Sequence, residues 1–113
     1  REIIQALKTI CDISQIDIHL HDTYGMGLAN AYAAVEEGVT SLDAAAGGLG
    51  GCPFVPGAKG NIATEDLVNM LQNMGYDTGF NLNKVLSTVR SMCDEIQAVP
   101  TSSLIQACKC HQK

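Results

Sequence analysis

Two histidines stand two positions apart in the sequence His19-Leu20-His21. Apolar and polar residues alternate across residues 15–21, and this period of two predicts a β-strand. Side chains at positions i and i+2 project from the same face of a strand, so the two imidazoles are expected to point together. Histidine is the commonest metal ligand, and together with oxygen ligands such a pair suits Mg²⁺ or Mn²⁺. Two hydrogen-bonded histidines without a metal are the alternative interpretation.

Asn61 and Glu65 form a second group of polar residues, near the start of a helix predicted over residues 63–74. The side-chain carbonyl of Asn61 is a hard oxygen donor that suits Mg²⁺, although an asparagine at this place is also an ordinary helix cap. Glu65 could support the neighbouring loop or a ligand, or it could only complement the helix dipole.

A glycine-rich loop is predicted over residues 47–61, and it carries Cys52. It is not a phosphate-binding P-loop, because no Gly-Lys-Ser/Thr sequence follows the glycines. Glycines permit motion, and a loop of this length is usually functional or disordered. A thiol in such a loop could donate or accept a proton or act as a nucleophile, and an incidental thiol in a mobile linker is the alternative. The further positions that we assign to the mobile loop are Gly48, Gly50, Gly51 and Pro53.

The elements that must position these residues alternate between helices and strands. Such alternation predicts βαβ units and therefore an α/β fold with a parallel sheet. The second strand is mostly apolar, as expected of a strand that is covered on both faces. We interpret residues 1–113 as a single partial domain in which residues 97–113 form a flexible, polar tail. The predicted elements are a helix end within residues 3–11, strands over residues 15–21 and 39–46, and helices over residues 27–37, 63–74 and 81–96.

Composition and charge exclude several classes of function. The chain has 113 residues and a formal net charge of −5, with 12 Asp and Glu against 7 Lys and Arg. No basic patch is available to neutralise phosphates, so nucleic-acid binding is not expected. No apolar run reaches the roughly 18 residues that a membrane helix needs, and no signal peptide is recognised, so neither a membrane location nor secretion is expected. The five cysteines are an odd number, which favours reduced thiols over a disulfide scaffold.

Three segments, in this order, resemble the 3-hydroxy-3-methylglutaryl-CoA lyase family. The resemblance runs through residues 19–25, 48–54 and 60–68, and more loosely through residues 81–86, so it covers most of the chain. The His-x-His-Asp motif is shared by a wider superfamily of metal-dependent lyases and synthases. The Gly-Leu-Gly-Gly-Cys-Pro motif is much more specific to the lyases.

The resemblance implies the C-terminal portion of a TIM (β/α)8 barrel, about the last three βα units plus a C-terminal helix. It also implies cleavage of 3-hydroxy-3-methylglutaryl-CoA, an acyl-CoA substrate, to acetyl-CoA and acetoacetate. Carried over by position, His19, His21 and Asn61 would bind Mg²⁺ or Mn²⁺. Cys52 would be the catalytic thiol, and Glu65 would support the same region.

The partner that the resemblance implies is the missing N-terminal part of the barrel, whose first strand would supply an acidic metal ligand and an arginine. The 113-residue segment alone is therefore expected neither to close a barrel nor to turn over substrate efficiently. A homodimer is included among the expected assemblies. The compartment would be the cytoplasm for a bacterial protein and the mitochondrial matrix for a eukaryotic one. Two alternatives stay open, namely a synthase that condenses an acyl-CoA with a 2-oxo acid and a non-catalytic metal-binding fragment.

Overall fold

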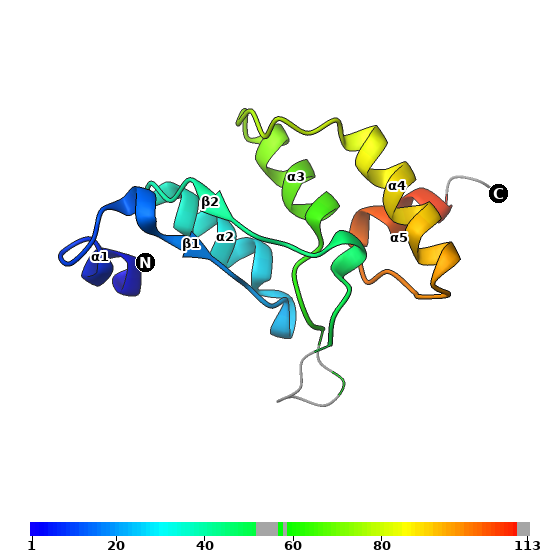
Figure 1. The fold of residues 1–113 in the computed structure, drawn as a ribbon, viewed down its shortest axis with the longest axis horizontal. Helices are drawn as coiled ribbons and strands as arrows, with labels where there is room; N and C mark the ends of the chain where they lie inside the picture. Colours follow the sequence, from blue (N-terminus) through cyan, green and yellow to red (C-terminus); the bar gives the residue numbers. More distant parts are fainter. Residues whose placement is uncertain (52–56, 58, 111–113) are drawn as a thin grey trace.

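The computed structural model describes residues 1–51, 57 and 59–110, in which helices and short strands alternate before three final helices (Figure 1). None of the helices in this described part is long and apolar enough to cross a bilayer. In chain order, the elements are α1 (Glu2–Leu7), a 3-10 helix (Ile13–Gln15), β1 (Asp17–Ile18), a 3-10 helix (Thr23–Gly25), α2 (Gly27–Glu36), β2 (Ser41–Leu42), a 3-10 helix (Ala46–Gly48), α3 (Thr64–Asn73), α4 (Leu82–Glu95) and α5 (Ser103–Cys110).

β1 and β2 lie side by side as parallel strands. Asp17 pairs with Ser41, and Ile18 pairs with Leu42. The connection between the two strands runs through α2, because parallel neighbours cannot be joined by a tight turn. The predicted parallel βαβ unit is therefore confirmed.

Both strands differ from the sequence prediction in length and in cover. The predicted strands over residues 15–21 and 39–46 shorten to two residues each, because ladder pairing is limited to two residue pairs. The expectation that the second strand is covered on both faces is wrong for the described structure. Ser41 and Asp43 are exposed on one face, whereas Leu42 packs against the helices on the other.

The segment that follows the glycine-rich loop lies between the ends of the two strands. It forms an antiparallel bridge from Asn61 to His21 and a parallel bridge from Ala63 to Ala45. Between these bridges, the Ile62 amide donates a hydrogen bond of 3.2 Å to the carbonyl of Leu20, and the Ile62 carbonyl accepts one of 3.0 Å from the amide of Ala45. This pairing places the end of the glycine-rich loop beside the residues that follow β1 and, at Ala45, beside the residues that follow β2.

Helices α2, α3 and α4 appear where the apolar periodicity predicts them. α2 packs through alanines three positions apart, with Ala31 in one core cluster and Ala34 in another. Gly38, at a φ of 92°, ends this helix in the left-handed region as predicted. The predicted cap of α4 is also confirmed, since the Asn81 side chain accepts a hydrogen bond of 3.1 Å from the Lys84 amide.

The chain is more extended than a compact domain of its size. Its Cα radius of gyration is 15.0 Å, against about 13 Å expected for 113 residues in a compact domain. Its accessible surface is 7228 Å², against about 6,000 Å² expected for a folded monomer of 12.0 kDa. Figure 1 shows the reason, since α4 and α5 form one end of an elongated molecule and α1 lies at the other.

Of the polar, flexible tail that the sequence predicts over residues 97–113, the part at residues 103–110 is helical instead. Residues 103–110 form α5, and Ile105 in its first turn has no exposed surface. Ile105 packs in one apolar cluster with Val89 and Cys93 of α4. A helix of eight residues is marginal by itself, so packing of this kind is what stabilises it.

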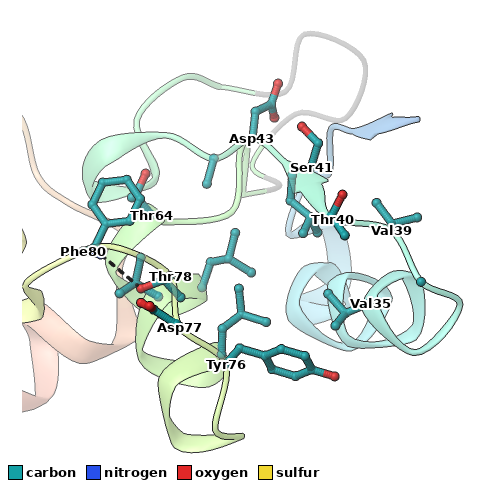
Figure 2. A pocket seen from close by; sticks show the side chains of 16 residues that line it. Val35, Val39, Thr40, Ser41, Asp43, Thr64, Tyr76, Asp77, Thr78 and Phe80 are labelled. Carbon is teal, nitrogen blue, oxygen red and sulfur yellow. Dashed lines mark hydrogen bonds between the residues drawn. The ribbon is translucent and has the colours of Figure 1, made fainter. Parts of the chain in front are cut away.

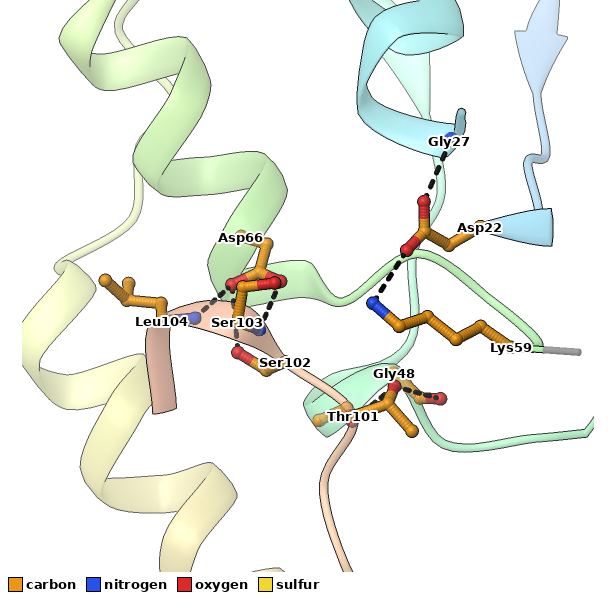
Figure 3. A network of polar contacts seen from close by, with 10 residues as sticks. Asp22, Gly27, Gly48, Lys59, Asp66, Thr101, Ser102, Ser103 and Leu104 are labelled. Carbon is orange, nitrogen blue, oxygen red and sulfur yellow. Dashed lines mark hydrogen bonds and ion pairs between the residues drawn. The ribbon is translucent and has the colours of Figure 1, made fainter. Parts of the chain in front are cut away.

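Asp66 on α3 provides the N-terminal cap of α5 (Figure 3). Its carboxylate accepts hydrogen bonds from the amides of Ser103 (2.8 Å) and Leu104 (2.9 Å) and from the hydroxyl of Ser102 (2.9 Å). The first amides of a helix have no partner within the helix, and a carboxylate there satisfies them and complements the dipole. Ser102 also caps the helix locally, because its hydroxyl accepts a hydrogen bond of 3.2 Å from the Ile105 amide. Asp66 lies 36 positions away from Ser102, so local sequence does not reveal its part of the cap.

Replacing this cap should destabilise the protein measurably. We expect Asp66→Ala to lower the free energy of unfolding by about 2 kcal/mol, because a charged cap and its hydrogen bonds are lost. Urea denaturation of the protein that contains this chain measures the change. Asp94→Ala, which removes an exposed carboxylate from α4, is the matched control and should have little effect. Equal losses in the two variants would contradict the capping role.

Candidate metal centre

The two histidines lie next to each other just beyond β1. Their ring centroids are 5.2 Å apart, and the rings meet edge to face at an interplanar angle of 68°. Ile18 and Leu20, which alternate with them, pack into apolar clusters. The predicted common orientation of His19 and His21 is therefore confirmed, and their metal binding stays a prediction.

Asp43 contacts the first histidine and was not recognised from the sequence. Its Oδ1 lies 2.6 Å from Nδ1 of His19, with both side chains about half exposed. The β1–β2 register explains the contact, because the position after the Ile18–Leu42 pair brings these two residues opposite each other. The alternation of polar and apolar residues after Thr40 was the available signal, but without the register it does not indicate which residue faces the histidine.

Asn61 stands beside His21 through the backbone bridge between them. Its side-chain amide nitrogen donates a hydrogen bond of 2.9 Å to the carbonyl of Leu49, which leaves the side-chain oxygen as the available donor atom. The alternative role of a helix cap is wrong, because Ala63 occupies the N-cap position of α3. The structure therefore brings three of the predicted site residues to one end of the strands.

Glu65 is completely buried in the first turn of α3. Its Oε2 accepts a hydrogen bond of 3.0 Å from the amide of Gly47, at the beginning of the glycine-rich loop. Its Oε1 has no hydrogen-bond partner within the described part of the chain. Glu65 thus contacts the base of the loop, which goes beyond complementing the helix dipole, and a buried oxygen remains available for a further donor.

The C-terminal end of the glycine-rich loop contacts the residue that follows His21 (Figure 3). Asp22, directly after His21, accepts from the Gly27 amide (3.0 Å) and forms an ion pair of 3.1 Å with Lys59. Gly60 packs so closely against the Gly50 carbonyl that any Cβ would overlap it. These contacts fix the two ends of the loop close together.

Some of the predicted site residues are not placed by the structure. Cys52 and Pro53 lie outside the described residues. Within residues 1–51, 57 and 59–110, no group of three or more His, Cys, Asp or Glu side chains is arranged to hold a metal ion. The described chain therefore brings together two imidazoles and an amide oxygen, which are fewer donors than a complete coordination shell needs.

A cavity of about 840 Å³ lies elsewhere, between α2 and α3 (Figure 2). Its wall is mainly apolar and includes Val35, Leu42, Leu67 and Leu71. Neither of the two histidines lines this cavity, and Asn61 does not line it either. Asp43, which contacts His19, does line the cavity, so the cavity lies beside the candidate metal residues without being formed by them.

Comparison with protein families gives a match to the HMGL-like model over residues 1–92. The chain belongs to the HMGL-like family. The match contains both histidines, the glycine-rich loop and Asn61, so the resemblance that the motifs indicate is confirmed on the residues that carry it.

Relatives in the HMGL-like family are lyases from several compartments. The chain is 41% identical over 110 residues to the mitochondrial hydroxymethylglutaryl-CoA lyase of Homo sapiens, which covers 96% of the chain and 34% of that protein. It is 46% identical over 90 residues to the cytoplasmic 3-hydroxy-3-methylglutaryl-CoA lyase of Rattus norvegicus, covering 80% of the chain and 26% of that protein. The chain thus spans about a third or less of the length of these relatives.

Solved structures of HMG-CoA lyases superpose on the chain. The HMG-CoA lyase of Bacillus subtilis gives a TM-score of 0.90 at 41% identity, over 96% of this chain and 36% of that one. An HMG-CoA lyase of Acinetobacter baumannii, in complex with coenzyme A and 3-methylmalate, gives a TM-score of 0.85 at 42% identity. That match covers 94% of this chain and 35% of that one. The fold of the chain is therefore α/β and corresponds to part of the barrel of these lyases.

Proposed function

We propose that the protein containing this chain is a divalent-metal-dependent lyase, which cleaves 3-hydroxy-3-methylglutaryl-CoA to acetyl-CoA and acetoacetate. The observation that carries the proposal is the position of His19, His21 and Asn61 at one strand end, in a chain 41% identical to a lyase of this name. The bound coenzyme A of the Acinetobacter baumannii relative supports an acyl-CoA substrate.

The donor set fits Mg²⁺ or Mn²⁺. The contact of His19 Nδ1 with Asp43 leaves Nε2 as a ligand atom, and the amide contact of Asn61 leaves its oxygen. Imidazole nitrogen and hard oxygen are donors that Mn²⁺ accepts, and Mg²⁺ retains positions for substrate oxygens and water. The remaining ligands would come from the substrate and from parts of the barrel outside this chain.

The chemistry fits the residues assigned to it. A divalent cation bound here would lower the pKa of the substrate's tertiary hydroxyl and orient the adjacent carboxylate. Loss of the hydroxyl proton and cleavage of the carbon–carbon bond would leave acetoacetate and a thioester enolate, and we assign to Cys52 the relay of that proton to the enolate, which gives acetyl-CoA. Glu65 holds the amide of Gly47, so its proposed role is to fix the loop base from which Cys52 acts. A closed loop would also exclude water.

The proposed architecture is the last three βα units of a barrel followed by C-terminal helices. β1 would be the sixth strand, β2 the seventh, and the extended segment of Asn61 the eighth. Active sites of such barrels lie at the carboxyl ends of the strands, where His19 and His21 stand. The proposed partner is the N-terminal part of the barrel, and a homodimer is the proposed assembly.

An assay of the protein that contains this chain tests the proposal. We expect stoichiometric acetoacetate and acetyl-CoA from 3-hydroxy-3-methylglutaryl-CoA with Mg²⁺ or Mn²⁺, and loss of turnover after chelation that either metal restores. The 113-residue chain alone should show no efficient turnover, because a whole barrel needs about 250 residues. Full activity of the isolated chain would contradict the proposed partial barrel.

The same assay separates the two alternatives. Condensation of acetyl-CoA with a 2-oxo acid, without cleavage of the lyase substrate, would indicate a synthase. Bound metal without turnover of either substrate class would indicate a non-catalytic metal-binding protein.

A further inference from the structure

Asp43 is the carboxylate that the strand register places against a candidate metal ligand. Its Oδ1 lies 2.6 Å from Nδ1 of His19, which is within hydrogen-bond distance. The two residues directly follow the paired residues Ile18 and Leu42, and the Asp43 amide donates a hydrogen bond of 3.1 Å to the Ile18 carbonyl, so paired backbones set their spacing. The neighbouring cross-strand pair is different, because Asp17 accepts a hydrogen bond of 2.9 Å from the hydroxyl of Ser41.

A carboxylate at Nδ1 selects one form of a neutral imidazole. An ionised carboxylate only accepts hydrogen bonds, so the proton of the ring must be on Nδ1 and the lone pair on Nε2. The contact also limits rotation of the ring about its bond to Cβ. His21, whose ring centroid is 5.2 Å from that of His19, has no such carboxylate contact in the described part of the chain.

The contact between His19 and Asp43 is expected to contribute little to the stability of the fold. The side chains of His19 and Asp43 are 56% and 54% exposed, and exposed ion pairs typically contribute between zero and about 1 kcal/mol. The consequence of the contact is therefore the orientation and tautomer of an exposed ring at the site. This orientation matters only if Nε2 of that ring binds something.

We propose that Asp43 is a positioning residue that holds His19 with Nε2 presented as a ligand to a divalent cation. The inference rests on the proposed metal-dependent function and deepens it, because it assigns a role to a residue outside the ligand set. Carboxylates behind metal-bound histidines fix the tautomer and raise the basicity of the ligand nitrogen. Asp43 thus acts through His19 and does not touch the reacting atoms.

Two readouts test the inference in the whole protein that contains this chain. The first is ¹⁵N NMR of histidine-labelled, metal-free protein at a pH where imidazole is neutral. His19 should carry its proton on Nδ1, and Asp43→Ala should shift the population toward the Nε2-protonated form. The second is the dissociation constant for Mn²⁺, which Asp43→Ala should raise about 10- to 100-fold. Asp43→Glu should restore part of both effects, because it returns a carboxylate to the same strand position.

Asp17→Asn is the matched control. It removes one carboxylate from the same strand pair, two residues before His19, but from a residue that contacts Ser41. A general loss of negative charge near the cation would affect both variants, whereas positioning affects only the Asp43 variant. The inference therefore expects a control with an unchanged tautomer and nearly unchanged Mn²⁺ affinity.

The outcomes separate the inference from the function on which it rests. If unmodified protein binds Mn²⁺ and Asp43→Ala changes neither the tautomer nor the affinity, the positioning role is overturned and the metal site stands. If unmodified protein binds no divalent cation, the proposed function is overturned and the inference with it. Equal weakening by Asp43→Ala and Asp17→Asn would reduce the effect to net charge and overturn positioning.

Discussion

Replacing His19 and His21 together by alanine should eliminate stoichiometric Mn²⁺ binding and lower turnover of 3-hydroxy-3-methylglutaryl-CoA by at least about 10³-fold. The magnitude follows from losing several kcal/mol of transition-state stabilisation by the cation, at 1.36 kcal/mol for each factor of ten. Two adjacent imidazoles, with ring centroids 5.2 Å apart, are the only nitrogen ligands that we assign. Metal analysis after dialysis and acetoacetate formation measure the two effects.

The result is informative only if the double variant folds, and the exposure of the histidine side chain indicates that it does. His19 is 56% exposed, so its removal leaves the apolar clusters behind the strand intact. Circular dichroism should therefore match that of the unmodified protein. His111→Ala is the control, because this third histidine lies beyond the residues 1–92 that match the family. Normal Mn²⁺ affinity in the double variant would overturn the assigned ligand pair.

The helices that the sequence predicts well are those whose signals are local. Asn81 accepts from the amide of Lys84 within one turn, so the cap is visible in four consecutive residues. α2 is ended by Gly38, whose positive φ is costly for other residues. In both cases the sequence segment contains its own start or stop signal, and tertiary contacts did not override it.

α5 was missed because most of its stabilising contacts are distant in sequence, and its local signal is limited to the cap in which the Ser102 hydroxyl accepts from the Ile105 amide. Its first amides bind to Asp66 on α3, and its buried residue Ile105 packs against α4. Only eight residues form it, too few for reliable periodicity and too few to be stable alone. A prediction from local pattern could not weigh contacts that exist only after α3 and α4 have packed.

The site was predicted in part for the same reason. Alternation within one strand predicts that His19 and His21 share a face, which needs no knowledge of neighbouring strands. The contact of His19 with Asp43 spans 24 positions and depends on the strand register, which the sequence pattern did not fix. A one-residue slip in that register would place Asp43 on the other face.

Cys52→Ala is expected to lower kcat by about 10²- to 10⁴-fold while leaving the Mn²⁺ dissociation constant unchanged. The thiol is assigned to proton delivery, and the cation ligands are on the strands, so chemistry and metal binding should separate. The described contacts at the loop ends support this separation, because Glu65 holds Gly47 and Lys59 pairs with Asp22 whatever residue stands at position 52.

The appropriate control for this variant is another cysteine removed from the site. Cys11 follows α1, the helix at one end of the elongated molecule (Figure 1), and donates to the carbonyl of Leu7 over 3.4 Å. Cys11→Ser should therefore retain normal kcat. Near-normal kcat in Cys52→Ala would refute the proton-transfer role, whereas parallel loss of kcat and Mn²⁺ affinity would mean that position 52 supports the metal ligands instead. A selective loss of kcat is the one result that assigns the proton step to the loop and the cation to the strand ends.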